Sequence, residues 1–132
     1  IENEGESTHI ERQLVQLFRR TLFNIIIGNR DDHLRNHGFL RGGNGWTLSP
    51  AFDVNPNPDK GEHVLTIDGH DASPDSRPLM ATADFYRLTP KAANLIEREV
   101  RNAVRGWDKK AGMLGLRNSE IGLMQSIIDP DR

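Results

Sequence analysis

Apolar residues recur at helical spacing from His9 to Ile27, and a second apolar stripe widens the same face. A helix with so wide an apolar face is buried on most of its sides. The residues of the two stripes are Ile10, Leu14, Val15, Leu17, Phe18, Thr21, Leu22, Ile25 and Ile26. The pattern predicts a long core helix that leads into a polar stretch after Gly28. We expect Arg19 and Arg20 on this helix to be solvated or paired with carboxylates.

Two short apolar-rich runs follow, one from His37 to Leu40 and one from Trp46 to Leu48. Between them, residues 41–45 are dense in glycine and asparagine, which favour turns. The sequence therefore predicts a β-hairpin that carries the chain from the polar stretch to a second short segment, Leu48 to Val54. Beyond that segment, the composition predicts loops over residues 55–62 and 68–78 and a short strand over residues 63–67.

The last third of the chain is predicted to be helical. Thr89 followed by Pro90 is a good start signal, because threonine caps helices and proline suits the first helical position. Apolar residues then keep helical spacing up to Gly106. The other predictions are a short helix capped by Thr82 and reaching Tyr86, a helix over 107–114, and a last helix capped by Asn118 or Ser119 and ending before Pro130. We expect these helices to form the core beneath the polar loop, with a solvated basic stripe of Arg98, Arg101 and Arg105.

Composition limits the function classes. The 132 residues are 36% hydrophobic and 27% charged, which predicts one globular domain. A net charge of -2 gives no general attraction to nucleic acid or to a membrane surface. No apolar run approaches the roughly 20 residues that span a bilayer, and we expect neither anchor nor signal peptide. The absence of cysteine excludes disulfides and fits a reducing cytoplasm.

The candidate chemistry lies in the polar stretch and in the segment after the hairpin. Asp31 follows the predicted core helix, Asn36 comes five residues later, and Asp53 lies beyond the hairpin. Phosphoryl transfer needs an acceptor for the proton of the nucleophile and oxygen ligands for magnesium. The spacing predicts that Asp31 is the proton acceptor, and that Asn36 and Asp53 are the magnesium ligands. We expect Leu34 to anchor the loop between Asp31 and Asn36.

Two motifs resemble a known family. Residues 27–40, I-G-N-R-D-D-H-L-R-N-H-G-F-L, and residues 48–54, L-S-P-A-F-D-V, resemble the C-terminal half of HipA proteins, bacterial serine/threonine kinases that act as the toxin of a toxin–antitoxin pair. More distantly, they resemble the D-x-x-x-x-N and D-F-G elements of eukaryotic protein kinases. The resemblance implies that Asp31 is the catalytic aspartate and that Asn36 and Asp53 bind magnesium. It also implies a set of residues along the nucleotide phosphates, namely His33, Leu34, Arg35, Asn36, Phe52 and Asp53.

The resemblance further implies a fold and partners. The expected fold is mainly α within the α+β class: a helical bundle like a protein-kinase C-lobe over residues 1–132, with a small β-hairpin at the active site. The expected cofactors are ATP and Mg²⁺, the substrate is a protein serine or threonine, and the partner is a HipB-like, DNA-binding antitoxin. The first lysine is Lys60, beyond both motifs, and no glycine-rich loop precedes Asp31. We therefore expect an ATP-covering lobe to be missing, and this fragment to be inactive alone.

Two other classes of function remain open. In a metal-dependent hydrolase, a transition metal would be gathered by Asp31, Asp32, His33, His37 and Asp53. His33 and His37 have the spacing of two ligands on one helix face, although Gly38 and the predicted strand disfavour a helix there. In a non-catalytic interaction module, the chain would only keep the remnants of a kinase fold.

Overall fold

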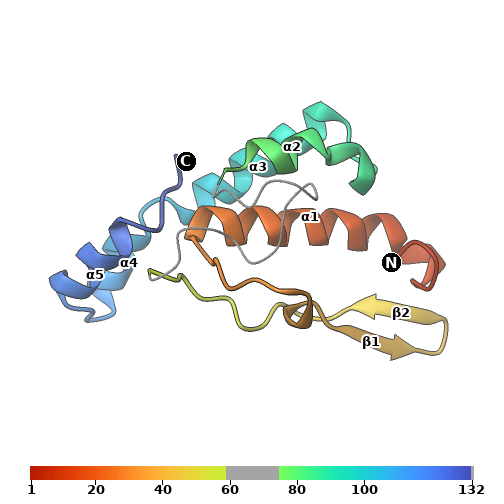
Figure 1. Cartoon of the computed structure of the whole chain (residues 1–132), viewed down its shortest axis with the longest axis horizontal. Helices are drawn as coiled ribbons and strands as arrows, with labels where there is room; N and C mark the ends of the chain where they lie inside the picture. The colour runs from red at the N-terminus through yellow and green to blue at the C-terminus, as the bar shows by residue number, and fades with distance from the viewer. Residues whose placement is uncertain (59–74, 132) are drawn as a thin grey trace.

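The computed structural model describes residues 1–58 and 75–131 of a mainly helical chain (Figure 1). The predicted strand at 63–67, and most of the loop residues predicted around it, lie outside the described residues. The helices are α1 (Ile10–Ile27), α2 (Arg77–Ala81), α3 (Pro90–Val104), α4 (Trp107–Met113) and α5 (Asn118–Gln125). The 3₁₀ turns are η1 (Ser7–His9), η2 (Leu34–Asn36) and η3 (Ala83–Tyr86), and the strands are β1 (Phe39–Gly42) and β2 (Gly45–Leu48). The predicted mainly helical fold with one small hairpin is confirmed.

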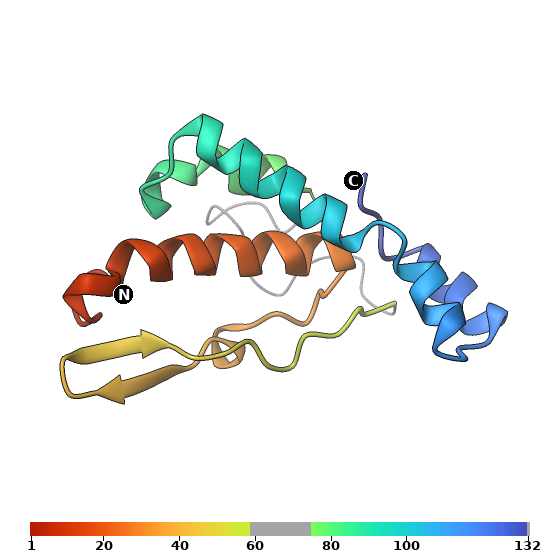
Figure 2. The same ribbon diagram turned by 180° about the vertical axis from the view of Figure 1, so that it is seen from behind.

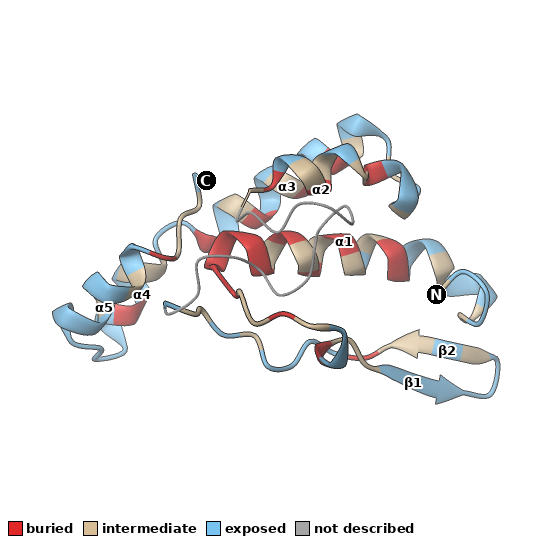
Figure 3. Cartoon of the chain, in the orientation of Figure 1, coloured by how far each residue is buried: buried red, intermediate tan, exposed pale blue. Residues whose placement is uncertain are grey.

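Helix α1 is the centre of the molecule, as its wide apolar face predicts. It lies between α2 and α3 on one side and the hairpin with its following segment on the other (Figures 1 and 2). Phe18, Leu22 and Ile26 are completely or almost completely buried along it. The ring of Phe18 meets that of Tyr86 edge to face, with 5.2 Å between centroids. Buried residues gather in the C-terminal half of α1 and just beyond it (Figure 3).

Helix α1 ends at a glycine that no other residue can replace without strain. Gly28 has φ 70° and ψ 32°, the left-handed conformation that closes many helices, and its N–H donates to the Ile25 carbonyl at 3.1 Å. A Cβ at this position would lie 2.3 Å from Cγ2 of Ile127. The Asp129 N–H also donates to the Ile26 carbonyl at 3.2 Å. The far end of the chain therefore packs against the end of the central helix.

The predicted hairpin is confirmed, with strands pairing from Phe39↔Leu48 to Gly42↔Gly45 around a two-residue turn. Its strand β1 is exposed along its whole length. Gln13 of α1 holds the other strand, because its Oε1 accepts a hydrogen bond from the Leu48 N–H at 2.7 Å. The hairpin is therefore attached to the core helix through polar contacts at its edge and contributes little apolar surface to the core.

The C-terminal helices follow the predictions except at their ends. Thr89 caps α3 as predicted, with its Oγ1 accepting from the Ala92 N–H at 3.2 Å. The predicted short helix through Tyr86 is present as η3, with Thr82 at its N-cap position. The Thr82 side chain does not cap it, because its hydroxyl donates to the Leu79 carbonyl at the end of α2. Helix α2 itself was not predicted, and its first two residues lie in the stretch predicted as loop.

The last helix, α5, begins earlier than predicted. Asn118 and Ser119 lie inside it, and the capping contact comes from Glu120, whose Oε2 accepts from the Arg117 N–H at 2.8 Å. The helix ends at Gln125, so Ile127 packs against Gly28 from the segment beyond it. Helices α4 and α5 pack mainly on each other, and the core is formed by α1 together with α2, η3 and α3.

In the part of the chain that the structure describes, no helix combines the length and the apolar character needed to cross a membrane.

Candidate active site

The loop after α1 is organised by one buried carboxylate, Asp32. Its Oδ2 accepts a hydrogen bond from the amide of Asn24 at 2.9 Å, and its Oδ1 lies 2.9 Å from Nε2 of His37. Asp32 is 8% exposed and Asn24 is 3% exposed. A buried carboxylate is stable only when its oxygens are hydrogen-bonded or paired. Both oxygens of Asp32 are satisfied, so this carboxylate ties the middle of the loop to Asn24 of α1 and to His37 at the end of the loop.

A second buried amide, that of Asn29, links this loop to the segment beyond the hairpin. Its Nδ2 lies 3.2 Å from Oδ1 of Asn24 and 3.4 Å from the carbonyl oxygen of Asp53. Asn29 is 2% exposed. In addition, the Asn57 N–H donates to the Gly28 carbonyl at 2.9 Å. Segments 24 or more residues apart in the sequence are thus held side by side at the end of α1.

Asp31 and Asn36 are brought into direct contact by the loop. The amide nitrogen of Asn36 donates to the backbone carbonyl of Asp31 at 3.3 Å. Asn36 is 6% exposed, and Asp31 is half-buried. Among the described residues, no group donates a hydrogen bond to Oδ1 of Asn36. The side chain of Asn36 is therefore anchored through its nitrogen, and its oxygen is not committed to any described residue.

Asp53 lies on the exposed segment after the hairpin in an unusual backbone conformation. Its φ of 54° is left-handed, which is uncommon for a residue other than glycine. Its Oδ1 accepts from the amide of Asn55 at 3.2 Å, and no described residue donates to Oδ2. Carboxylate oxygens are among the hard oxygen donors that magnesium prefers, so the chemistry of Asp53 suits the predicted role. The link between its segment and the loop of Asp31 and Asn36 runs through the Asp53 backbone carbonyl and the amide of Asn29.

The other predicted nucleotide contacts differ in their surroundings. Leu34 is 76% exposed, so the prediction that it anchors the loop is wrong, and Asp32 and Asn36 do so instead. Arg35 is also exposed. His33 precedes η2, and its Nδ1 is buried with no hydrogen-bond partner among the described residues. Phe52 is 46% exposed, with one ring edge against Gly38.

Arg20 is not solvated, and no described carboxylate forms a salt bridge with it at hydrogen-bonding distance. It is 9% exposed, and its Nη2 donates to the Ser49 carbonyl at 2.6 Å. Burial lowers the pKa of the Arg20 guanidinium, and the carboxylate of Asp32 acts in the opposite direction. Arg19 does form the expected ion pair, at 2.8 Å from Glu99. Arg20 thus places a positive charge beneath the loop and holds the segment after β2.

The residues proposed for a transition-metal site are not gathered. Among the described residues, which include all five of them, no group of three or more His, Asp or Glu side chains is arranged to hold a metal ion. The oxygens of Asp32 are committed to Asn24 and His37. His33 and His37 flank the η2 turn and do not share a helix face. The hydrolase alternative is therefore not supported by the geometry.

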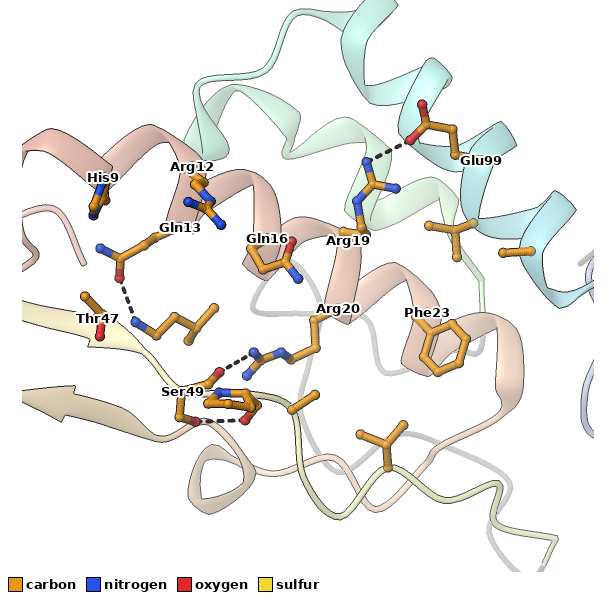
Figure 4. A pocket seen from close by; sticks show the side chains of 16 residues that line it. His9, Arg12, Gln13, Gln16, Arg19, Arg20, Phe23, Thr47, Ser49 and Glu99 are labelled. Atoms are coloured by element: carbon orange, nitrogen blue, oxygen red, sulfur yellow. Dashed lines mark hydrogen bonds and ion pairs between the residues drawn. The ribbon is translucent and has the colours of Figure 1, made fainter.

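A groove of about 870 Å³ runs along α1, between the segment 47–54 on one side and α3 on the other (Figure 4). Arg12, Gln16 and Phe23 line it from α1, and Glu99 lines it from α3. None of Asp31, Asn36 and Asp53 lines this groove. It reaches the candidate site only through Ala51 and Val54, the neighbours of Phe52 and Asp53.

The sequence analysis missed the two asparagines on which the network depends. Asn24 stands among Leu22, Phe23 and Ile25 in the most apolar part of α1, and Asn29 follows its terminal glycine. A polar side chain inside a strongly apolar helix must find a buried partner. That rule, applied to Asn24, would have predicted a buried polar contact with the loop.

Comparison with protein families gives one match. Residues 2–107 match the family model described as HipA-like C-terminal domain. The matched stretch includes α1, the loop, the hairpin, Asp53 and α3, and it ends at the first residue of α4. A comparison with curated proteins found no match.

Proposed function

Because the chain belongs to the HipA-like C-terminal domain family, we propose that it forms the catalytic region of a bacterial serine/threonine kinase, the toxin of a toxin–antitoxin pair. The observation that carries this proposal is the buried amide of Asn29. Its contact with the Asp53 carbonyl joins the segment of one expected magnesium ligand to the loop that holds Asp31 and Asn36.

In this proposal Asp31 accepts the proton of a serine or threonine hydroxyl. The hydroxyl oxygen forms a bond to the γ-phosphorus of ATP, the bond from that phosphorus to the β–γ bridging oxygen breaks, and ADP leaves. Magnesium, when bound, neutralises charge on the phosphate oxygens. Asn36 and Asp53 would hold it through Oδ1 of the amide and the open carboxylate oxygen. The loop network keeps these groups in place without a rearrangement at the time of transfer.

The proposal also includes the cellular location, the substrate and the partner of the kinase. The kinase acts in the cytoplasm on a protein substrate, and a HipB-like DNA-binding antitoxin restrains it, so that contact with DNA is indirect. His33, Leu34, Arg35 and Phe52 lie along the phosphates of ATP. A further lobe, supplied by other parts of the full-length protein, covers the nucleotide, so the 132-residue chain alone binds ATP weakly.

The decisive test is Asp31→Asn in the full-length protein. Loss of the proton acceptor is expected to lower the rate of phosphate transfer from labelled ATP by about 10²-fold to 10⁴-fold. Asp84→Asn, which changes an exposed carboxylate in η3, is the matched control and is expected to keep the normal rate.

Two results would contradict the proposal. One is normal transfer by a folded Asp31→Asn protein, with folding checked by thermal melting. The other is tight binding of Mg²⁺ and ATP by the 132-residue chain in calorimetry, which would show that no further lobe is needed. If the unmodified full-length protein neither binds magnesium nor transfers phosphate, a non-catalytic interaction module is favoured instead.

A further inference from the structure

The groove along α1 has the length and shape of a site for an extended chain. It follows one helix face, since the α1 residues that line it recur every three or four positions: Arg12, Gln13, Gln16, Arg19, Arg20 and Phe23. From Arg12 to Phe23 the helix rises about 17 Å, which is the length of about five extended residues. Its walls are the backbone of 47–51 and helix α3 (Figure 4). A linear peptide fits this shape better than a compact small molecule.

The charges of the groove are mostly positive. Arg12 is exposed and has no ion pair or hydrogen bond among the described residues. Arg20 lies nine-tenths buried in the groove wall, and its Nη1 has no hydrogen-bond partner among the described residues. Arg19 is neutralised by Glu99, the one carboxylate among the described residues that line the groove. Within the described part of the chain, Arg12 and Arg20 are therefore left without a carboxylate in direct contact.

The other end of the groove is apolar. Phe23 and Val54 are half-buried there, and Ala103 of α3 is exposed. Figure 4 shows the ring of Phe23 at the end opposite Arg12. The groove thus has the exposed guanidinium of Arg12 at one end, the buried guanidinium of Arg20 between the ends and an apolar surface at the other end (Figure 4). This combination favours a chain with the complementary pattern.

We propose that this groove binds an extended acidic peptide segment of a partner protein. Its carboxylates bind at the Arg12 end, near Gln16, and an apolar side chain covers Phe23 about five residues away. The proposal does not rest on phosphoryl transfer, because none of the expected catalytic and magnesium-binding residues lines the groove. A basic peptide or a polyanion without apolar groups satisfies only one end of the groove.

The test uses the 132-residue chain and the fluorescein-labelled peptide D-E-E-G-S-L-L-V, together with its reversed sequence because the direction of binding is open. At least one of the two is expected to bind in fluorescence anisotropy, and a rise from about 0.05 M to about 0.5 M salt is expected to weaken binding. The peptides K-K-K-G-S-L-L-V and D-E-E-G-S-S-S-S are expected to bind at least about tenfold more weakly.

Matched variants locate the site. Arg12→Glu is expected to weaken binding by about tenfold or more. Arg98→Glu, which reverses an exposed arginine of α3 outside the groove, is expected to leave binding unchanged. Ala103→Glu adds a carboxylate at the apolar end without removing any core contact, and it too is expected to weaken binding.

Several outcomes would overturn the proposal. These are no binding of either acidic peptide at about millimolar concentration, equal binding of the basic peptide, or equal loss in Arg12→Glu and Arg98→Glu. A concentration-dependent dimer in sedimentation, abolished by Arg12→Glu, would assign the groove to a second copy of the chain and overturn it as well.

Discussion

Regular secondary structure is usually more buried than loops, but two regions of this molecule show the opposite. They are the loop of residues 28–37 and the pair of helices α4 and α5. The loop has only one short 3₁₀ turn, yet Asn29, Asp32 and Asn36 in it are each less than a tenth exposed. The helix pair is regular, yet Met113 of α4 is 87% exposed and Leu123 of α5 is 53% exposed. The family match covers the loop and ends where the helix pair begins.

The difference shows that side-chain hydrogen bonds can fix a segment more firmly than helical backbone alone. In the loop, Asp32 and Asn29 bond to α1, and Asn29 also contacts the segment beyond the hairpin. Asn36 bonds within the loop, to the Asp31 carbonyl. In the helix pair, the apolar surface of α5 is only partly used, because no residue of that helix is buried. A short helix without tertiary packing is marginally stable in water. We therefore expect substitutions in the irregular loop to cost more than substitutions in the helices.

The largest effect is expected from Asp32→Ala. This change leaves the amide of Asn24 and the ring of His37 without their acceptor, and it removes the charge that opposes the effect of burial on Arg20. Removing this buried carboxylate, which leaves its partners unsatisfied, is expected to lower the free energy of unfolding by about 3 kcal/mol. The comparison is Met113→Ala in α4, whose unfolding free energy in urea is expected to lie within about 0.5 kcal/mol of that of the parent chain. Equal midpoints for the two variants would remove the distinction between loop and helix pair.

A second test uses two glycines with similar backbone conformations. Gly28 and Gly115 have φ of 70° and 89°, but a Cβ at Gly28 meets Ile127 while one at Gly115 meets nothing within 4 Å. Gly115→Ala, in the helix pair, is expected to cost about 1 kcal/mol from backbone strain alone. Gly28→Ala adds the clash and is expected to cost about 2 kcal/mol, measured by the same denaturation. A larger loss for Gly115→Ala would contradict the packing described for Gly28.

A third test asks whether the core beneath the loop responds to alkaline pH. Burial raises the pKa of Tyr86, and the polar interaction of its hydroxyl with Thr21 acts in the opposite direction. A raised folded-state pKa means that the stability is fully present below the ordinary value of 10.0 and is lost as the pH rises through the folded value. Tyr86→Phe is expected to flatten this part of the stability profile. An unchanged alkaline slope in the variant would assign the slope to other groups.

The smallest effect is expected at the start of α5. Two hydrogen bonds from Arg117 lower the pKa of Glu120 below its ordinary value of 4.5. The larger effect comes from the Arg117 side chain and the smaller one from its backbone N–H. A lowered folded-state pKa contributes stability above the ordinary value, and the contribution is lost as the pH falls through the folded value. Because Glu120 is fully exposed, we expect faster amide exchange at Arg117 in acid and no change in the global melting temperature. A global shift in melting temperature on Glu120→Gln would show that α5 is coupled to the core.

Patterns of apolar spacing predicted the elements well where burial determines them. Helix α1 and helix α3 match their predicted extents because each has one continuous apolar face. Short elements were harder, since a five-residue helix such as α2 has too few positions to show a period. The end of α5 was misjudged because Ile127 and Ile128 continue the apolar spacing after the helix has ended.

Residue types and spacing predicted the candidate site. They did not predict the hydrogen-bond network that holds its loop in place. Asp31, Asn36 and Asp53 were selected by their chemistry, and their roles stay predictions. Leu34 was expected to hold the loop because apolar residues usually anchor, but the anchor is polar. Which of two adjacent carboxylates turns inward depends on partners such as Asn24 and His37, and no local pattern reveals them.

The contact between Ile127 and Gly28 also makes the stability of the loop dependent on a distant part of the chain. Roughly one hundred residues separate the two partners, and the contact comes from beyond the stretch that matches the family. Trimming the chain to the boundaries of the family match would remove the hydrogen bond to Ile26 and expose the last turn of α1 to water. Expression fragments and fusion joints are therefore better designed to retain the segment through Asp129.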